Sequence, residues 1–143
     1  MQAYATSDDF VAAFGQDEAV RLTATYDAPD QVDVTTLAGA LDRATIRVDA
    51  ITSFRYPAGF KIVPRLLTGI TCDLARYELA TSGGRVLTEE VDKRREEADK
   101  LLRMLADGRV KLGLDIDDQQ VDWGHGVQQL PADTTLRDAL EDY

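Results

Sequence analysis

Hydrophobic residues recur at helical spacing through the middle of the chain. Over residues 34–54 the apolar positions advance by three or four residues at a time, which predicts a helix of about six turns. The stripe consists of Val34, Leu37, Leu41, Ala44, Val48 and Ile51. Asp33 is placed to cap this helix, and the segment Tyr56-Pro57-Ala58-Gly59 ends it because Pro and Gly interrupt helical hydrogen bonding.

A second long helix is predicted from Pro64 to the segment Ser82-Gly83-Gly84, which ends it. Apolar residues cover a wide arc of this helix, which places it at the centre of a bundle. The arc consists of Val63, Leu66, Leu67, Ile70, Leu74, Ala75 and Tyr77. Cys72 lies in the same helix and is expected to be a small buried side chain rather than a reactive thiol.

A third long helix, over residues 88–106, has one apolar and one highly charged face and ends at Asp107-Gly108. The apolar face consists of Leu87, Val91, Ala98, Leu101, Leu102 and Leu105. Four acid-before-base pairs four residues apart are predicted to form weak salt bridges along the helix. These pairs are Glu89–Lys93, Glu90–Arg94, Glu96–Lys100 and Asp99–Arg103. The basic run Lys93-Arg94-Arg95 is therefore interpreted as part of a solvated face and not as a nucleic-acid site.

Two short helices are expected nearer the N-terminus, over residues 7–15 and near residues 16–22, with Ser7 capping the first and Gly15 ending it. A loop follows over residues 26–33. Its acidic residues are Asp27, Asp30 and Asp33. A calcium-binding loop would need a central Gly and a closing Glu, which this segment lacks, so a solvated loop is the favoured interpretation.

The last quarter of the chain changes to the alternating pattern of a strand, followed by more widely spaced apolar residues. These apolar positions are Val110, Leu112, Leu114, Ile116, Val121, Trp123, Val127 and Leu130. A lone strand is not stable in water, so the segment either folds back on the bundle as a coil or pairs with another chain. We interpret residues 109–143 as an acidic interaction arm after a helical domain of residues 1–108, with a last short helix at residues 136–143.

Composition fits one folded domain with such an arm. The chain has 143 residues, 44% of them hydrophobic, and 16 cations against 26 carboxylates give a net charge of −10. Residues 107–143 hold three cations and nine carboxylates, more than half of that net charge. The charge argues against sequence-specific DNA binding. The predicted fold class is all-α, a bundle of about five helices with an extended C-terminal arm that includes the short strand.

Candidate chemistry is sparse along the sequence. It has no Gly-rich phosphate loop, no HExxH zinc motif, no GxSxG nucleophile elbow and no CxxC pair. Its single histidine, His125, lies between two glycines and is interpreted as a surface turn residue. The N-terminus lacks the basic and apolar regions of a secretory signal, and no segment approaches a membrane span. We expect no enzyme, no catalytic residue, no cofactor and no metal.

Several short segments resemble one family. Ala3-Tyr4-Ala5-Thr6, Arg55-Tyr56-Pro57, Pro64 and above all Cys72-Asp73-Leu74-Ala75-Arg76-Tyr77 resemble the small structural proteins of Mu-like prophages. The helical layout is similar to that of head–tail connector, or adaptor, proteins of tailed phages. The resemblance covers residues 3 to about 114, and residues after Leu114 match no family pattern.

The resemblance assigns structural roles to the residues that carry it. Within the central motif, Asp73 and Arg76 lie three residues apart and are expected to form an ion pair or to cap a neighbouring loop. Tyr56 and Tyr77 are expected to pack against other residues rather than to bind a ligand. The full set of motif residues is Tyr56, Pro57, Pro64, Cys72, Asp73, Ala75, Arg76 and Tyr77.

The resemblance implies a virion protein of the neck that is assembled in the host cytoplasm. Its subunits would form a ring, dodecameric by analogy with connectors, that binds the portal protein and a tail or stopper protein. DNA would pass through without specific binding, which suits a charge of −10, and no membrane is involved. The alternatives are a neck stopper or tail-completion protein, or an acidic DNA-mimic or regulatory protein that occupies the basic groove of a nucleic-acid enzyme.

Overall fold

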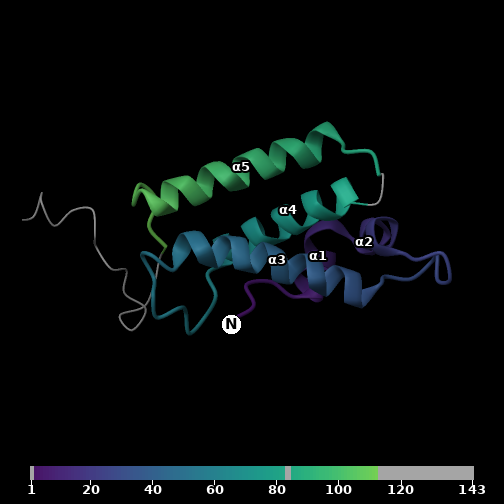
Figure 1. The fold of residues 1–143 in the computed structure, drawn as a ribbon, viewed down its shortest axis with the longest axis horizontal. Coiled ribbons are helices and arrows are strands. Elements are labelled where there is room, and N and C mark those ends of the chain that lie inside the picture. Colours follow the sequence, from purple (N-terminus) through teal and green to yellow (C-terminus); the bar gives the residue numbers. More distant parts are fainter. Residues whose placement is uncertain (1, 83–84, 113–143) are drawn as a thin grey trace, which may run out of the picture.

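The computed structural model describes residues 2–82 and 85–112, and within them the chain folds into five α-helices (Figure 1). The helices are α1 (Ser7–Phe14), α2 (Gln16–Thr23), α3 (Val34–Thr52), α4 (Arg65–Thr81) and α5 (Glu89–Ala106). In these ranges the only extended pairing is one isolated bridge between Thr25 and Ala28. The prediction of an all-α bundle of about five helices is confirmed for this part of the chain.

Local capping explains where the first helices begin and end. The Thr6 hydroxyl accepts a hydrogen bond from the Asp9 N–H, and the Asp9 carboxylate accepts one from the Thr6 N–H, which is a capping box. The prediction of Ser7 as the cap is wrong by one residue, because Thr6 is the last residue with extended backbone (ψ 168°). Gly15, at φ 93°, ends α1 as predicted and leads directly into α2.

The predicted start of α3 is confirmed, and its end lies slightly earlier than expected. The Asp33 side chain accepts a hydrogen bond from the Thr35 N–H, 3.1 Å away. The helix ends at Thr52 rather than Phe54, since the carbonyl of Thr52 accepts from the N–H groups of both Arg55 (3.0 Å) and Tyr56 (2.8 Å). These two bonds turn the chain away from the helix axis before the proline at position 57.

Helix α4 is the centre of the bundle, as its wide apolar arc predicts. It packs against each of the other four helices, and α5 runs along both α3 and α4 (Figure 1). The residues that α4 buries include Leu67, Ile70, Leu74 and Leu79. Two predicted core positions are wrong: Val34 is 62% exposed and Leu87 is 36% exposed. Each stands at the N-terminal edge of a helix, where the chain leaves the bundle.

The N-terminal segment lies across α3 and α4 and forms hydrogen bonds to both helices and to the connection between them. The Tyr4 hydroxyl donates to Asp49 of α3 (2.6 Å), and the Tyr4 carbonyl accepts from the Thr68 hydroxyl of α4 (2.9 Å). The Gln2 amide donates to the carbonyl of Phe60 (2.6 Å) in the α3–α4 connection. Residues that resemble the family at the N-terminus therefore serve the packing of the bundle.

The three long helices run in alternating directions, which gives the bundle two distinct ends. Ion pairs Arg43–Glu78, Asp73–Arg94 and Arg47–Asp99 fix this register between α3 and α4, α4 and α5, and α3 and α5. One end carries the α2–α3 and α4–α5 connections, and the other carries the α3–α4 connection and the C-terminus of α5 (Figure 1). This arrangement determines which surfaces are available to partners.

The beginning of the predicted arm is part of the bundle. Leu112 is 9% exposed and Val110 packs against the core, while residues 109–112 form bends and coil rather than strand. The N–H groups of Arg109 and Val110 both bond to the carbonyl of Met104, which directs the chain back onto the helices. The strand prediction is wrong for these residues. The other predicted arm positions and the expected helix at 136–143 lie outside the described residues.

Arg55 holds the end of α5 against the α3–α4 connection. Its side chain is buried, and its Nε donates to the carbonyl of Ala106 at 2.6 Å, so a cation satisfies a free carbonyl at a helix C-terminus. Gly108 has φ 74°, and a Cβ added there would lie 2.6–2.7 Å from atoms of the Arg55 guanidinium. Glycine at this position therefore allows both the turn and the Arg55 contact.

We predict that Gly108→Ala lowers the free energy of unfolding by about 1–2 kcal/mol, because alanine disfavours this backbone conformation and displaces Arg55. Gly69→Ala is the matched control. A Cβ at Gly69 has no atom within 4 Å, so this helix substitution should raise stability by roughly 0.5–1 kcal/mol. Urea denaturation followed by circular dichroism measures both, and equal effects of the two substitutions would contradict the role of Gly108.

Candidate functional site

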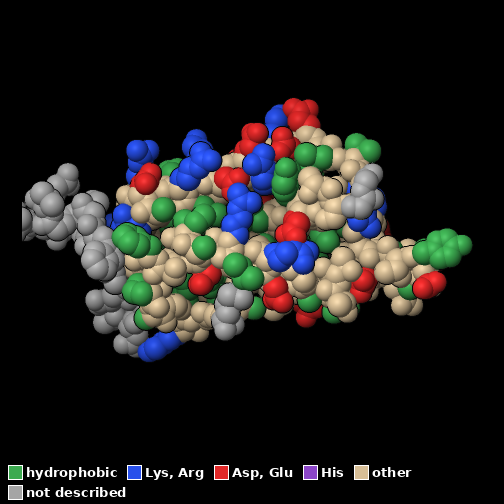
Figure 2. Space-filling model, in the orientation of Figure 1, with side chains coloured by type: hydrophobic (Ala, Val, Ile, Leu, Met, Phe, Trp, Pro, Cys, Tyr) green, Lys and Arg blue, Asp and Glu red, His purple; other side chains and the backbone are tan. Residues whose placement is uncertain are grey.

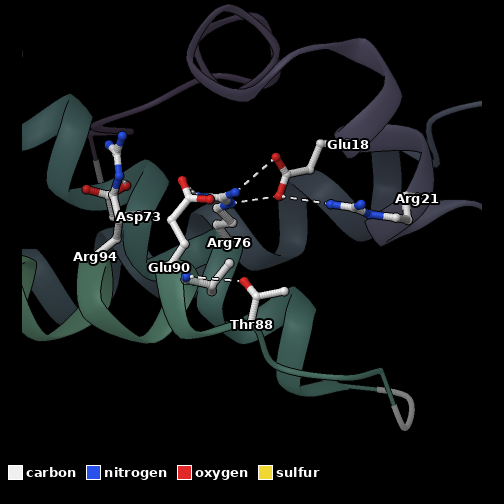
Figure 3. A network of polar contacts seen from close by, with 8 residues as sticks. Glu18, Arg21, Asp73, Arg76, Thr88, Glu90 and Arg94 are labelled. Carbon is white, nitrogen blue, oxygen red and sulfur yellow. Dashed lines mark hydrogen bonds and ion pairs between the residues drawn. The ribbon is translucent and has the colours of Figure 1, made fainter.

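Arg76 of α4 lies where charged side chains from three helices meet (Figure 3). Its side chain is 7% exposed. Its Nε and Nη2 donate to the two carboxylate oxygens of Glu18 in α2, at 2.7 and 3.1 Å, and its Nη1 lies 3.5 Å from Glu90 Oε1 in α5. Two-pronged pairing of this kind matches the planar fork of a guanidinium to a carboxylate.

The buried guanidinium also has an aromatic neighbour. Its Cζ lies 4.5 Å from the centre of the Phe14 ring, at the end of α1. Glu18 also forms a second, longer ion pair with Arg21, whose Nη2 lies 3.5 Å from Glu18 Oε1. A single arginine thus connects α4 with α1, α2 and α5, and its hydrogen-bonding capacity is used inside the bundle.

Asp73 and Arg76 do not form the ion pair with each other that the sequence predicts. Asp73 instead lies 3.8 Å from Arg94 of α5. Burial raises the pKa of Asp73 above its usual range, while the charges of Arg94 and Arg76 act in the opposite direction. Each of the two side chains finds its partners across a helix interface, Asp73 in α5 and Arg76 in both α2 and α5.

Charges of α5 pair both with other helices and along the helix itself. Of the four pairs predicted along α5, the Glu89–Lys93 pair forms, at 2.8 Å, in the described structure. Two of the other predicted acids have different partners: Glu90 pairs with Arg76, and Asp99 pairs with Arg47 at 3.0 Å and with Arg95 at 3.2 Å. The charged face of α5 therefore contributes to packing on α3 and α4 and is not only a solvated surface.

The remaining family-motif residues have packing roles. Cys72 and Ala75 are buried in the core, which confirms the expectation for the cysteine. Tyr77 lies beneath the guanidinium of Arg95, with 4.7 Å from Cζ to the ring centre. Tyr56 is buried, with its ring centre 5.2 Å from that of Phe60. Two prolines flank the connection: Pro57 is exposed, and Pro64 is the residue before α4.

A cavity of about 440 Å³ opens beside this network, between α2, the end of α4 and the start of α5. Its apolar wall consists of Leu22, Ala80, Val86 and Val91. Its polar lining consists of Glu18, Arg21, Arg85 and Thr88. Glu18 is already held by Arg76, so the part of the cavity open to a partner is mainly apolar with a charged rim.

In residues 2–82 and 85–112, no three His, Cys, Asp or Glu side chains are grouped so that they could hold a metal ion. Burial, with smaller contributions from Asp9 and Asp73, raises the pKa of Cys72 to about 12, so the thiol stays protonated at neutral pH. No helix in the described ranges is long and apolar enough to cross a membrane.

Sequence reasoning missed the partners of the buried arginines. Phe14, Glu18 and Glu90 surround Arg76, and the Ala106 carbonyl accepts from Arg55, yet none of these residues stands out in its own segment. One signal was present, because Arg76 lies between Ala75 and Tyr77 on a helix that is apolar over a wide arc. A cation on a buried arc requires an acidic partner from another helix.

Comparison with known proteins gives two matches. A family model described as "Bacteriophage Mu, Gp36" matches residues 4–129. The Mu-like prophage FluMu protein gp36 of Haemophilus influenzae (strain ATCC 51907 / DSM 11121 / KW20 / Rd) is 31% identical to this chain over 88 residues. That alignment covers 62% of this chain and 60% of the relative. The family match continues beyond Leu114, so the expectation that later residues match no family pattern is wrong as far as residue 129.

We predict that Arg76→Leu lowers the free energy of unfolding by about 3 kcal/mol, because Glu18 and Glu90 then keep their charges without the buried cation. Arg94→Leu is the matched control. The Arg94 side chain is 52% exposed and 3.8 Å from its partner, so its loss should cost less than about 1 kcal/mol. Equal stabilities of Arg76→Leu and the unmodified chain in urea denaturation would refute the stabilising role of the Arg76 contacts.

The double variant Arg76→Leu/Glu18→Leu tests the cause of that loss. If the penalty is the unpaired carboxylate of Glu18, removing it should recover part of the lost stability, since apolar residues often replace a buried ion pair at little cost. A double variant less stable than Arg76→Leu alone would show that the loss has another origin.

We predict that Cys72, the single cysteine of the chain, is labelled by a thiol reagent only after the bundle opens. At pH 8 its labelling should be at least about a thousandfold slower than in urea-unfolded protein, because opening costs several kcal/mol. Since folding raises the thiol pKa from 9.0 to about 12, its contribution to stability is complete below pH 9 and declines as the pH rises through that window. Fast labelling of folded protein would contradict its burial.

Proposed function

The chain belongs to the bacteriophage Mu Gp36 family, and we propose that it is a structural subunit of the virion neck, a head–tail connector that joins portal and tail. In this proposal several copies form a ring, dodecameric by analogy with connectors, through which DNA passes without specific binding. The subunit acts by assembly in the host cytoplasm and needs no catalysis, cofactor or metal.

The observation that carries the proposal is the family match over residues 4–129 together with a surface suited to assembly. Large hydrophobic side chains are exposed on the bundle, among them Tyr26 (99%), Val86 (87%) and Ile62 (76%). These side chains lie on three different connections between helices and are candidate positions for contact with another protein. The charged residues of the family motif are meanwhile used within the bundle, which keeps the subunit rigid.

The charge of the chain fits a channel through which DNA passes better than it fits a protein that mimics DNA. A net charge of −10 repels phosphate, as suits a channel that must not retain the DNA. A DNA mimic needs unpaired carboxylates in a rigid lattice, whereas Asp73, Asp99 and Glu18 are paired with arginines. A stopper or tail-completion role in the same neck is the alternative within this class.

The arm has a proposed part in assembly that begins after Leu112. Leu112 belongs to the core, so a substitution there would destabilise the subunit itself. Leu114 and Ile116 continue the alternating pattern but lie outside the described residues. We propose that the segment containing them contacts a neighbouring subunit or the portal, as an added strand or in another extended form.

Deletion of the gene from its phage is predicted to leave DNA-packaged or emptied heads and separate tails, visible by electron microscopy. Purified protein added to the lysate should restore joined, infectious particles. Protein carrying Leu114→Asp/Ile116→Asp should fail to restore them while keeping the helicity of the unmodified protein.

Two outcomes would contradict these expectations. Normal joined particles without the protein would refute the connector function and favour a regulatory role. Full restoration by the Leu114→Asp/Ile116→Asp variant would refute the role of the arm while leaving the connector function in place.

A further inference from the structure

Charges are segregated between the two ends of the bundle. We define the acidic end as residues 16–33 and 85–92, which hold eight carboxylates and two cations, a net charge of −6. We define the basic end as residues 53–65 and 100–112, which hold seven cations and one carboxylate, a net charge of +6. Figure 2 shows cationic side chains over the C-terminal part of α5, and hydrophobic and acidic side chains at the tip of the α2–α3 connection.

Compensation of helix dipoles accounts for only part of this segregation. Carboxylates in the first turn of α5 and cations in its last turn do stabilise that helix. The effect fades within one turn, however, and several of the charges lie in connections beyond the helices. These residues include Asp27 and Asp30 at the acidic end, and Arg109 and Lys111 at the basic end. Helix dipoles do not account for the placement of these charges.

Exposed apolar side chains are concentrated at the same two ends. At the basic end Ile62 (76%) and Phe54 (66%) project from the α3–α4 connection. At the acidic end Val86 (87%) stands at the mouth of the apolar cavity between α2, α4 and α5. Among the described residues, the exposed large apolar side chain that lies away from both ends is Ile46, which is 52% exposed in the middle of α3. The basic end therefore offers projecting apolar groups, and the acidic end combines an apolar recess with exposed apolar groups of its own, among them Tyr26.

We propose that copies of this chain bind head to tail, with the basic end of one copy docked on the acidic end of the next. In this contact Ile62 and Phe54 pack against the cavity beside Val86. Exposed cations of the basic end, such as Arg109 and Lys111, face exposed carboxylates of the acidic end, such as Asp27 and Asp30. A head-to-tail pair keeps one free acidic end and one free basic end, so further copies can add, and the series closes into a ring when the rotation per copy allows.

The inference deepens the proposed connector function and rests on it for the closed ring. It assigns the partner of both ends as a second copy of the chain, because the two ends are opposite in charge and the recess of the acidic end can receive the projecting groups of the basic end. The surrounding surfaces, including the sides of α3 and α5, are left for the portal and tail components.

Blocking the two ends separately tests the contact in the full-length protein. Val86→Asp blocks the acidic end, Ile62→Asp blocks the basic end, and Ile46→Asp is the matched control on the side of the bundle. All three residues are more than half exposed, so the helicity should be unchanged. Light scattering gives the molar mass of each protein alone and of equimolar mixtures.

The unmodified chain and Ile46→Asp should form species larger than a dimer, and less so at high salt because salt screens the charges. Val86→Asp and Ile62→Asp should each be monomeric alone. Their equimolar mixture should form dimers and nothing larger. The intact basic end of Val86→Asp binds the intact acidic end of Ile62→Asp, and both of the ends that stay free are blocked. This doubling of mass on mixing is specific to a head-to-tail contact.

Three results would overturn the inference. The first is an unmodified chain that stays monomeric up to about 1 mM, where even weak contacts are populated. The second is a blocked variant that forms dimers by itself, since that contact would be symmetric. The third is retained assembly of both blocked variants. If such variants still restore joined particles in the deletion lysate, the connector function stands and only the end-to-end contact fails.

Discussion

The buried charge of Arg76 is the constraint on which the bundle depends. A guanidinium 7% exposed on the central helix must be neutralised, and its two strong hydrogen bonds require α2 to bring Glu18 to it. The same group fixes the start of α5 through Glu90 and the end of α1 through Phe14. Apolar burial makes these helices associate, and the arginine selects how they are placed relative to α4.

Local signals explain how much of the fold follows from the sequence. Helix periodicity, Asp33 as a cap and the glycines at 15 and 108 predict the elements, because each acts within a few residues. Partner choice does not follow, since spacing along one helix cannot tell whether Asp99 pairs along α5 or with Arg47 of α3. The alternation at Val110 and Leu112 was misinterpreted for the same reason: a buried coil can place apolar residues at alternate positions when a core lies beside it.

The interior and the surface of the bundle have different roles in this account. The residues that resemble Mu-like prophage proteins are mostly buried or half-buried, where they support packing, and the family match is what relates the chain to phage. The candidate contacts lie instead at the ends of the bundle, in connections whose residues no sequence motif marks. Their charge segregation becomes visible only when the alternating helix directions bring separate segments to one end.

The most direct test of the connector account is the molar mass of a purified portal ring before and after addition of this protein. The account predicts one complex, heavier than the portal by a fixed whole number of 15.8 kDa subunits. A portal of unchanged mass, combined with salt-sensitive binding of the protein to a basic DNA-processing enzyme, would contradict the account and identify an acidic regulatory protein instead.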